Sequence, residues 1–456
     1  MRNALVVAVL TSVSLDILVP AANAQSRQVP PLDRAACAER IRSEFLHAWR
    51  AYEQHAWGHD ELRPVSRTAH DWYGTSIGMT PVDALDALIL LGFREEAAKV
   101  TSWISQNLSF DQDVTVKNFE VTIRLLGGLL SAYQLSGDER LLQLARDLGT
   151  RLLPAFDSPT GMPYMYVNLQ TGAVSGARTN PAEVGTLLLE FGTLARITGE
   201  PVFYDKAKRA LVQLYDRRSK IGLVGEEIDV ETGEWIGRAS HVGGGIDSYY
   251  EYLLKCARLF DDADCARMWQ ESQRALETRL AHETATGLWY GQVDMVTGAR
   301  TATEFGALHA FLPGVLALAG DLKRAQALQA SCDKMWRLHG IEPEVLDYST
   351  MQVVHAGYPL RPEIMESAYI LHRTTQHDRY LDMGWNYFEG LLVHCRTDAG
   401  YTTLKSVVTK EKGDLMPSYF LAETLKYLYL LFAPEETLDY RAVVFTTEAH
   451  PLRRTW

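Results

Sequence analysis

Acidic residues recur at the start of apolar segments that we predict to be helices. Three of them are Glu120 in Phe119-Glu120-Val121, Asp247 before Ser248, and Glu363 after Arg361-Pro362. A barrel built only of helices gathers the ends of its inner helices at one mouth, so carboxylates distant in sequence could share a pocket. Carboxylates that share a pocket with arginines and aromatic side chains are what the hydrolysis of a glycosidic bond requires. These residues therefore indicate chemistry on sugars.

The elements that must position these acids repeat along the chain as an apolar helix, a turn and an amphipathic helix. Their spacing of about 45 to 62 residues is at or slightly beyond that of known helical-pair repeats. Seven turns predict seven helical hairpins. The turns lie near residues 91–92, 136–138, 198–200, 261–262, 319–321, 376–378 and 433–434.

The helices before the turns, such as 121–135, 184–197 and 420–432, are apolar on all sides, which is typical of buried helices. Those after the turns, such as 139–153, are amphipathic. We interpret the two sets as an inner and an outer ring. The prediction is an all-α fold, an (α/α)7 barrel of seven helical hairpins. An open solenoid is the alternative, but it would need capping repeats, and none is recognisable.

Short β-hairpins are expected at one rim of this barrel. Two candidates are residues 165–172 and 227–235, where strand-like segments surround Thr-Gly turns.

Six of the seven predicted inner helices carry acids near their starts; the fifth, around 307–318, offers only His309. A plain explanation is favourable interaction with the helix N-terminus, about 0.3–1 kcal/mol for each acid. Acids buried beyond the first turn need partners, and Arg124 and Arg361 are the natural ones. An acidic cluster also suits a cation or a polyhydroxyl ligand. The acids are Asp83, Asp86, Glu120, Glu183, Glu190, Asp247, Glu251, Glu363, Glu366 and Glu423.

Composition and targeting signals restrict the function further. The 456 residues are 47% hydrophobic and carry a formal charge of −12 without a basic run, so we expect no nucleic-acid partner. Residues 1–24 resemble a cleaved secretory signal, 25–40 an N-terminal extension, and 41–456 a single barrel domain. No later segment is apolar for long enough to span a bilayer. We expect a monomeric periplasmic or secreted protein that makes no membrane contact after signal cleavage.

The five cysteines are Cys37, Cys256, Cys265, Cys332 and Cys395. An odd number leaves at least one thiol free unless it pairs between chains. Because no CxxC motif or cysteine–histidine cluster occurs, a structural zinc site is not expected.

Eight segments resemble, in order, those of class I α-1,2-mannosidases of glycoside hydrolase family 47. The resemblance runs from about residue 41 to the C-terminus, and eight segments in register are a specific signal. The segments are WGHDELRP (57–64), VDALD (82–86), FEVTIR (119–124), LLPAF (152–156), DSYYEYLLK (247–255), LRPE (360–363), LAETLKY (421–427) and TEAHP (447–451).

The resemblance implies a seven-fold α/α barrel and a calcium-dependent exo-hydrolase that removes terminal α-1,2-linked mannose with inversion from high-mannose glycans or mannans. Inversion requires two carboxyl groups about 6.5–9.5 Å apart, with a water between base and sugar. By the matching motifs, Glu120 is the acid, acting through a water, and Glu363 is the base. Asp247 is the third catalytic carboxylate, either as an acid or as electrostatic support.

The resemblance also implies a Ca²⁺ ion bound directly by the carbonyl and hydroxyl oxygens of Thr447. Calcium takes six to eight oxygen ligands, so waters and sugar hydroxyls complete the shell. The waters would be held by Glu363, Glu366, Glu423 and Glu448. Tyr419 matches an aromatic platform under the terminal mannose, where phenylalanine is usual. The substrate-binding set is Arg124, Glu183, Arg361, Glu366, Tyr419 and Glu423.

Three departures from the family pattern bear on structure and specificity. Ala310 replaces a cysteine that pairs with the counterpart of Cys332, so that bridge cannot form. Gly306-Ala307 replaces an Asp-His pair, which predicts a missing sugar contact. Gly245 replaces an arginine that restricts branch choice in reticulum-type enzymes. Its absence predicts wider outer subsites and relaxed branch selectivity.

Two other functions fit parts of the pattern. A non-hydrolytic, lectin-like mannose-binding protein could use the same scaffold, although the three carboxylates and Thr447 argue against it. A sugar epimerase would need paired histidines at the inner helix ends, and the sequence places none there.

Overall fold

The inner ring of the fold consists of helices whose sides are almost wholly apolar. In the computed structural model, which describes residue 1 and residues 32–454, residues 188–195 of one inner helix are all buried, with Glu190 as the single charge. The inner segments are α2 (Met79–Asp83) with α3 (Leu85–Leu90), α5 (Asn118–Val121) with the π-helical η1 (Thr122–Leu126) and α6 (Gly127–Ser136), α8 (Pro181–Gly185) with α9 (Leu188–Thr198), α11 (Asp247–Phe260), η3 (Ala307–Phe311) with α13 (Leu312–Leu318), α15 (Glu363–Thr375), and the π-helical η4 (Phe420–Thr424) with α17 (Leu425–Phe432).

The outer helices bury one face only. In one of them, Leu141, Ala145, Leu148 and Leu152 face inward while the charged residues between them stay outside. This spacing of three to four residues is what a helix needs to pack on an inner ring. The outer helices are α1 (Arg34–Ala56), α4 (Arg94–Asn107), α7 (Glu139–Leu152), α10 (Pro201–Asp216), α12 (Ala263–Arg279), α14 (Leu322–Arg337) and α16 (Arg379–His394).

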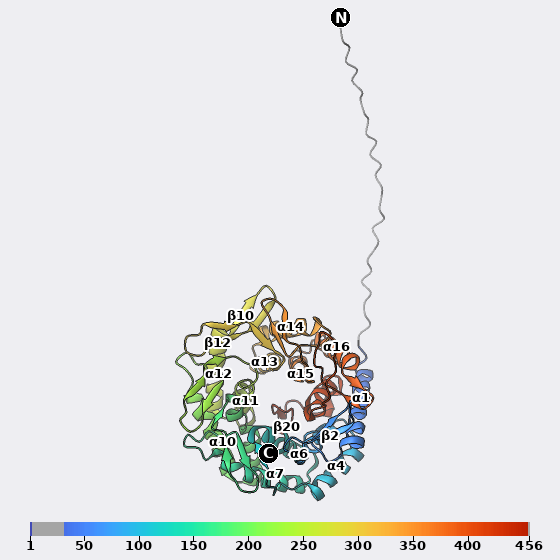
Figure 1. Ribbon diagram of the computed structural model, residues 1–456, viewed down its shortest axis with the longest axis vertical. Helices are drawn as coiled ribbons and strands as arrows, with labels where there is room; N and C mark the ends of the chain where they lie inside the picture. The colour runs from blue at the N-terminus through green and yellow to red at the C-terminus, as the bar shows by residue number, and fades with distance from the viewer. Residues whose placement is uncertain (2–31, 455–456) are drawn as a thin grey trace. The chain divides into compact units, whose positions relative to one another are not determined.

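Residues 33–454 thus form a closed (α/α)7 barrel, as predicted, and Figure 1 looks along the axis of its ring. Six predicted turns join an inner helix to the outer helix that follows. The seventh turn, at residues 433–434, ends α17 but leads to no outer helix. Instead α17 packs on α1 from the other end of the chain, which closes the ring. Residues 34–40, which the sequence suggested as an extension, belong to α1.

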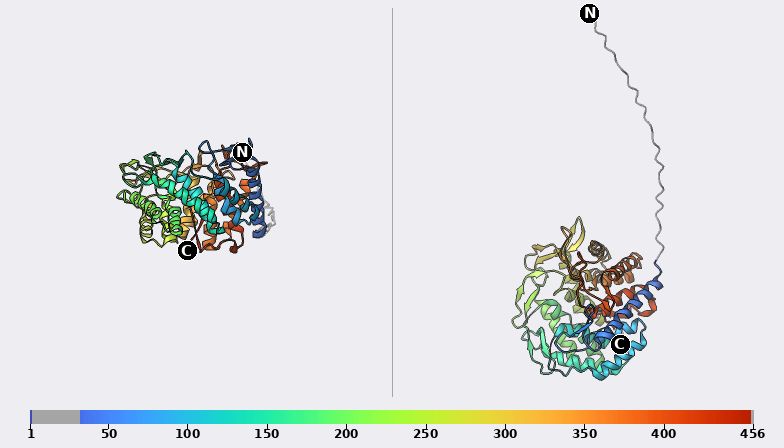
Figure 2. Two further views of the ribbon diagram at one scale, coloured as in Figure 1. Left: turned by 90° about the horizontal axis from the view of Figure 1, so that it is seen from below. Right: turned by 45° about the vertical axis from the view of Figure 1, so that its right-hand side comes forward.

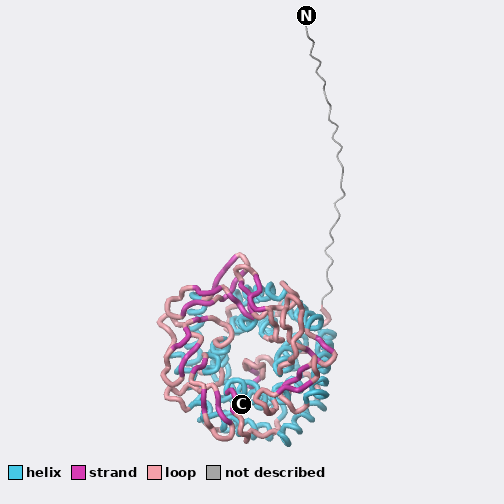
Figure 3. Tube along the Cα trace, viewed as in Figure 1, coloured by secondary structure: helices cyan, strands magenta, loops and turns pink. Residues whose placement is uncertain are grey.

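Short antiparallel strands connect the hairpins, and Figure 3 shows strands and loops gathered over the helices on the face toward the viewer. The two predicted hairpins are present as β4–β5 and β7–β8. The described strands are β1 (Glu61–Arg63), β2 (Thr68–His70), β3 (Thr115–Lys117), β4 (Tyr166–Asn168), β5 (Val174–Ser175), β6 (Arg178–Thr179), β7 (Glu227–Asp229), β8 (Trp235–Gly237), β9 (Ala239–Ser240), β10 (Ala281–Thr284), β11 (Gly287–Tyr290), β12 (Gln292–Asp294), β13 (Arg300–Ala302), β14 (Glu304–Gly306), β15 (Val345–Asp347), β16 (Gln352–His355), β17 (Arg396–Thr397), β18 (Gly400–Tyr401), β19 (Val443–Phe445) and β20 (Pro451–Arg453).

The last hairpin, β19–β20, lies inside the ring. Its register pairs Val443 with Arg453 and Phe445 with Pro451. β19 packs against α11 and β20 against α6, and the views from two directions agree with this placement (Figures 1 and 2). The turn between the two strands, residues 446–450, therefore projects toward the middle of the barrel.

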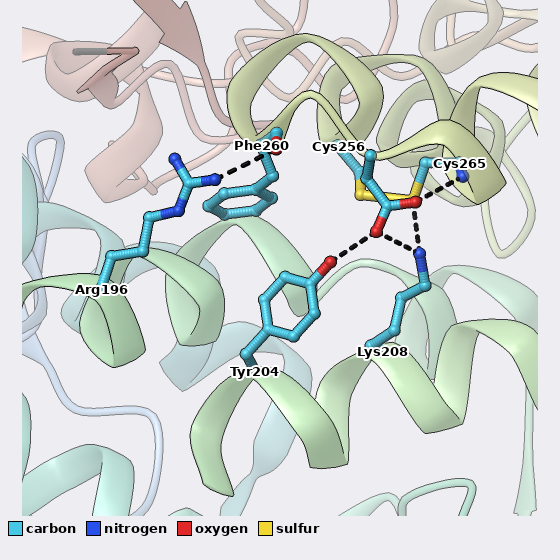
Figure 4. The surroundings of a disulfide bond; sticks show 7 residues. Arg196, Tyr204, Lys208, Cys256, Phe260 and Cys265 are labelled. Carbon is cyan, nitrogen blue, oxygen red and sulfur yellow. Dashed lines mark hydrogen bonds and ion pairs between the residues drawn. A yellow bond between two sulfur atoms is a disulfide. The ribbon is translucent and has the colours of Figure 1, made fainter. Parts of the chain in front are cut away.

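A disulfide joins Cys256 on α11 to Cys265 on α12, which links an inner helix to its outer partner (Figure 4). Cys37, Cys332 and Cys395 are free and buried. Cys332 lacks the partner that Ala310 replaces. Of the helices in the described part of the chain, none combines the length and apolarity needed to cross a bilayer.

Residues 2–24 of the predicted signal segment and residues 25–31 of the extension lie outside the described residues.

Candidate active site

One cavity opens at the N-terminal ends of the inner helices. Asp247 and Glu363 are the first residues of α11 and α15, while Glu120 and Glu183 lie in the short helices α5 and α8. About 260 Å³ of the cavity is accessible to water-sized molecules. All eleven residues that the sequence suggested for the site line it. They are Glu120, Arg124, Glu183, Asp247, Arg361, Glu363, Glu366, Tyr419, Glu423, Thr447 and Glu448.

Arg124 is the central cation of the cavity wall. Its Nε and Nη2 atoms donate to Glu120 Oε2 at 3.1 and 3.0 Å, and its Nη1 contacts Glu448. The guanidinium also lies 5.4 Å from the ring centroids of both Trp72 and Tyr419. Arg124 sits in a π-helical turn, a feature often found at functional sites. Its charge compensates the buried acids on either side.

Glu120 is flanked by two cations. Besides Arg124, Lys117 places Nζ 3.9 Å from Glu120 Oε1 and 2.8 Å from Glu183 Oε1. Both cations can pair with the Glu120 carboxylate. Lys117 was missed by sequence reasoning because nothing in its neighbourhood distinguishes it from a surface lysine before a helix.

Asp247 and Glu363 have a different environment. Burial raises the pKa of Asp247 to about 7, and the nearby charge of Glu251 adds to this while Arg361 opposes it. Burial likewise raises the pKa of Glu363 to about 8. Asp247 Oδ1 accepts from the N–H of Ser248 at 2.8 Å, whereas Glu363 Oε2 has no hydrogen-bond partner among the described residues. Both carboxyl groups can hold a proton near neutral pH.

Arg361 and Tyr419 form a further part of the cavity wall. Arg361 donates through Nε and Nη2 to the two carboxylate oxygens of Glu344 at 3.2 and 2.6 Å. The Tyr419 hydroxyl donates to the carbonyl oxygen of Pro359 at 2.6 Å, which fixes its ring at the cavity surface. A fixed aromatic ring can stack on a sugar.

The turn at residues 446–450 carries Thr447 and Glu448 to the cavity floor. His450 holds this turn from below: its Nδ1 lies 2.7 Å from Asp86 Oδ2 and its Nε2 lies 3.2 Å from Asp83 Oδ1. Lys426 Nζ donates to the carbonyl oxygen of Ala449 at 2.7 Å. The predicted acids Asp83 and Asp86 therefore lie beneath the cavity, where they anchor the turn instead of lining the site.

Of the acidic residues at the cavity floor, some have a cationic partner and some do not. Lys255 lies 3.4 Å from Glu366 and also contacts Glu251. Glu423 forms no ion pair with any described residue, and burial and the charge of Glu448 raise its pKa well above the usual range. A hard divalent cation bound by oxygen would supply the missing positive charge.

The donor set fits a cation held largely through water. Within residues 32–454, no three carboxylates of the cavity approach closely enough to bind one ion together; the cluster that does is Cys256, Asp262 and Cys265. Two members of that cluster form the disulfide, so it is not a thiolate site. Thr447 lines the same cavity, and its carbonyl and hydroxyl oxygens are of the kind that such a cation prefers.

Two of the positions that depart from the family pattern can be located at the wall of the cavity. Gly245 lines the cavity with φ +89, and a Cβ at this position would lie 3.7 Å from Asn180. There is space for a side chain, but the left-handed backbone favours glycine. Near Gly306-Ala307 the wall is formed by the apolar side chains of Leu308 and Phe311.

A histidine pair does exist, but it lies outside the cavity lining. His241 and His309 stack with ring centroids 6.0 Å apart, and burial lowers the pKa of His241 to about 4 and of His309 to about 3. Neither histidine is among the residues that line the cavity with the carboxylates. This arrangement does not favour epimerase chemistry.

The barrel and its carboxylate-lined cavity together define a carbohydrate-active α/α-barrel enzyme. Residues 44–454 match the model of glycosyl hydrolase family 47. The chain therefore belongs to glycosyl hydrolase family 47.

Similar proteins agree with this assignment. The ER degradation-enhancing alpha-mannosidase-like protein 2 of Homo sapiens is 38% identical over 92% of this chain and 78% of its own length. The endoplasmic reticulum mannosyl-oligosaccharide 1,2-alpha-mannosidase of Homo sapiens is 38% identical over 90% of this chain and 62% of its own. The alpha-1,2-mannosidase from Trichoderma reesei superimposes with a TM-score of 0.85 at 28% identity, over 92% of this chain and 99% of that one.

A cellobiose 2-epimerase from Bacillus thermoamylovorans, at a TM-score of 0.60 and 11% identity, shares the fold alone.

Proposed function

We propose that this protein is a calcium-dependent, inverting exo-α-1,2-mannosidase. The observation that carries the proposal is the meeting of Glu120, Asp247, Glu363 and Thr447 in one cavity, although they come from four distant segments. The mannosidase names of its relatives support the substrate class. The terminal mannose of an α-1,2-linked oligosaccharide, from a high-mannose glycan or a mannan, is the proposed substrate.

In the proposed reaction, Glu363 in its ionised form, which the charge of Arg361 favours, takes a proton from a water whose oxygen attacks the anomeric carbon. The bond from that carbon to the linking oxygen breaks, and the leaving hydroxyl receives a proton from the acid side of the cavity. The resemblance implies Glu120 for this role, acting through a water. The geometry favours Asp247 as the group that carries the proton, because two cations flank Glu120 while Asp247 is buried without one bonded to it.

Ca²⁺ at Thr447 would be held by the oxygens of that residue and by waters on Glu363, Glu366, Glu423 and Glu448. When bound, the ion would orient sugar hydroxyls and offset the charge of the surrounding acids. Arg124, Arg361 and Tyr419 would bind and orient the sugar. Because the turn at 446–450 closes the floor, only the end of a glycan fits, which supports exo-action.

Product analysis by NMR on α-1,2-mannobiose, with and without a chelator, tests the proposal. We expect β-mannose as the first product, and activity that disappears with the chelator and returns with Ca²⁺. An α-mannose product would contradict inversion, and undiminished activity after complete metal removal would contradict the calcium site.

The same method applied to a Man9-type glycan tests branch selectivity. Gly245 leaves the wall open near Asn180, so we expect trimming of all α-1,2 branches. Accumulation of a single Man8 isomer would contradict this expectation.

A lectin-like function is the second candidate, because the cavity would bind mannose even without turnover. Replacing Glu363 by Gln separates the two. We expect the variant to bind mannobiose with an affinity close to that of the wild type but to lose turnover by about 10²–10⁴-fold, the usual contribution of an acid or base. If wild type and variant are equally inactive, the lectin function replaces the enzymatic one.

We further propose that the protein acts as a monomer in the periplasm or outside the cell. The disulfide between Cys256 and Cys265 supports an oxidising compartment.

A further inference from the structure

A second cavity lies at the other end of the inner helices. About 250 Å³ of it is accessible to water-sized molecules, and it lies where α11, α13 and α15 meet β19. Its apolar lining consists of Leu318, Ile370, Val443, Val444 and Phe445. The rest of the wall is formed by Lys255, by the ring of Tyr440 and by three arginines, Arg258, Arg441 and Arg454.

The three arginines lack acidic partners. Among the described residues, none of their guanidinium groups forms an ion pair with a carboxylate, although the protein carries a formal charge of −12. In contrast, the buried Arg124, Lys255 and Lys426 all contact acids. Burial lowers the pKa of Arg258, and the charge of Arg454 beside it lowers that pKa further.

Helix capping accounts for only part of this arrangement. Arg258 Nη1 donates to the carbonyl oxygen of Leu318 at 3.1 Å, and Arg454 Nε donates to that of Arg258 at 3.1 Å. Cations at helix C-termini are favourable by about 0.3–1 kcal/mol. A guanidinium has five N–H donors, however. Arg258 uses one of its donors in these bonds. Arg454 uses two, because its Nη1 also donates to the carbonyl oxygen of Arg441 at 3.4 Å. The guanidinium of Arg441 makes no hydrogen bond within the described structure.

We propose that this cavity, which we call the arginine cavity, binds a small organic anion. The anion would be a carboxylate or a phosphate ester on a compact apolar body. Its charged oxygens would meet Arg258, Arg441 and Arg454, since guanidinium groups pair with such oxygens in a bidentate manner. Its apolar part would contact Val443 and Phe445 of β19. At about 250 Å³ the cavity is smaller than usual sites for drug-sized ligands, which measure roughly 300–1,000 Å³.

Isothermal titration of the full chain with phenyl phosphate, with benzyl alcohol as the neutral counterpart, tests the proposal. We expect one molecule of phenyl phosphate to bind per chain and benzyl alcohol to bind far more weakly. Arg258→Met and Arg441→Met should each weaken binding roughly tenfold, the loss of about 1.4 kcal/mol of charge-assisted hydrogen bonding. Arg441 is exposed, so its replacement leaves folding intact even if Arg258→Met does not.

Arg453→Met is the matched control. Arg453 is the neighbour of Arg454 in the chain but lines a different hollow, so this variant should bind like the wild type. Absence of binding to the wild type would overturn the proposal. So would equal affinity in Arg441→Met and the wild type, which would place the anion elsewhere, for example at the arginines of the catalytic cavity. The readout is binding alone, so the result does not depend on the proposed mannosidase activity.

Discussion

Glu120 and Asp247, two carboxyl groups of the catalytic cavity, differ in how closely cationic side chains approach them. Glu120 bonds Arg124 at 3.0 Å and lies 3.9 Å from Lys117, whereas Asp247 is buried with the N–H of Ser248 as its main donor. A carboxyl group that must give up a proton works best when its pKa lies near the working pH. Asp247, with a pKa of about 7, meets that condition.

Asp247→Asn therefore should lower turnover of α-1,2-mannobiose by about 10²–10⁴-fold. In the wild type Asp247, with a pKa of about 7, must be protonated while Glu363, with a pKa of about 8, must be ionised, so kcat/KM should pass through a maximum between about pH 7 and 8 and fall at higher pH. The variant should lose this alkaline decline. It should keep much of its activity on α-mannosyl fluoride, whose leaving group needs no proton. Steady-state kinetics against pH provide the measurement.

Glu120→Gln serves as the comparison. If Glu120→Gln, and not Asp247→Asn, loses the alkaline decline and retains fluoride hydrolysis, the proton comes from Glu120 and the assignment to Asp247 is wrong.

Among the elements, the turn at 446–450 depends on contacts beneath it. His450 is fully buried between Asp83 and Asp86, whose charges and hydrogen bonds raise its pKa against the effect of burial. Gly127 leaves room for its ring, because a Cβ there would lie 2.8 Å from His450 Cδ2. The position of Thr447, and with it the proposed calcium site, rests on this contact.

His450→Gln should lower the free energy of unfolding by roughly 3–5 kcal/mol, because it removes the shared buried partner of Asp83 and Asp86 and leaves Lys426 to compensate Asp86 alone. We also expect the dissociation constant for Ca²⁺ to rise by at least about tenfold, as the turn loses its anchor. Thermal melting and calorimetric calcium titration measure the two effects. His372→Gln is the control, since His372 is equally buried but lies toward the other end of α15. A calcium affinity unchanged in His450→Gln would refute the anchoring role.

The spacing of apolar residues along the sequence was sufficient to predict most of the helices. Apolar residues on all sides of residues 184–197 and on one side of 139–153 distinguish inner from outer helices, because burial on all sides and on one side require different patterns. The pairing of α17 with α1 could not be predicted, since a ring closure joins segments that share no local pattern. The acids of the site followed from their places at helix starts. Their partners did not, because Lys117 and Lys255 meet them only in three dimensions.

For the whole molecule, the disulfide is the one covalent link that the described residues show between the two rings. Cys256 and Cys265 are nine residues apart, and Asp262 between them caps α12 and accepts from Tyr204 at 2.5 Å. In Figure 4, Tyr204 and Lys208 of α10 point toward this loop. The disulfide therefore closes a turn that the hydrogen bonds of Asp262 already stabilise.

Replacing Cys256 and Cys265 by Ser should lower the free energy of unfolding by roughly 2–3 kcal/mol, the closure entropy of a short loop. Activity at moderate temperature should remain, because no residue from Cys256 to Cys265 lines the catalytic cavity. Melting curves with and without a reductant test this. The wild type should lose stability with the reductant and the double variant should not. If both respond equally, the disulfide does not form in the protein.

The order in which the chain is made has a consequence for when this protein can work. α1 leaves the ribosome before the six helical pairs that follow it, yet its inner partner α17 and the residues that reach the cavity floor come after all of them. Until they arrive, six helical pairs form an arc with an apolar flank exposed. A chain that lacks α17 and the turn at 446–450, whether unfinished or clipped, would thus be inactive and prone to association. The ring and the catalytic cavity would be completed together, in one late step of folding.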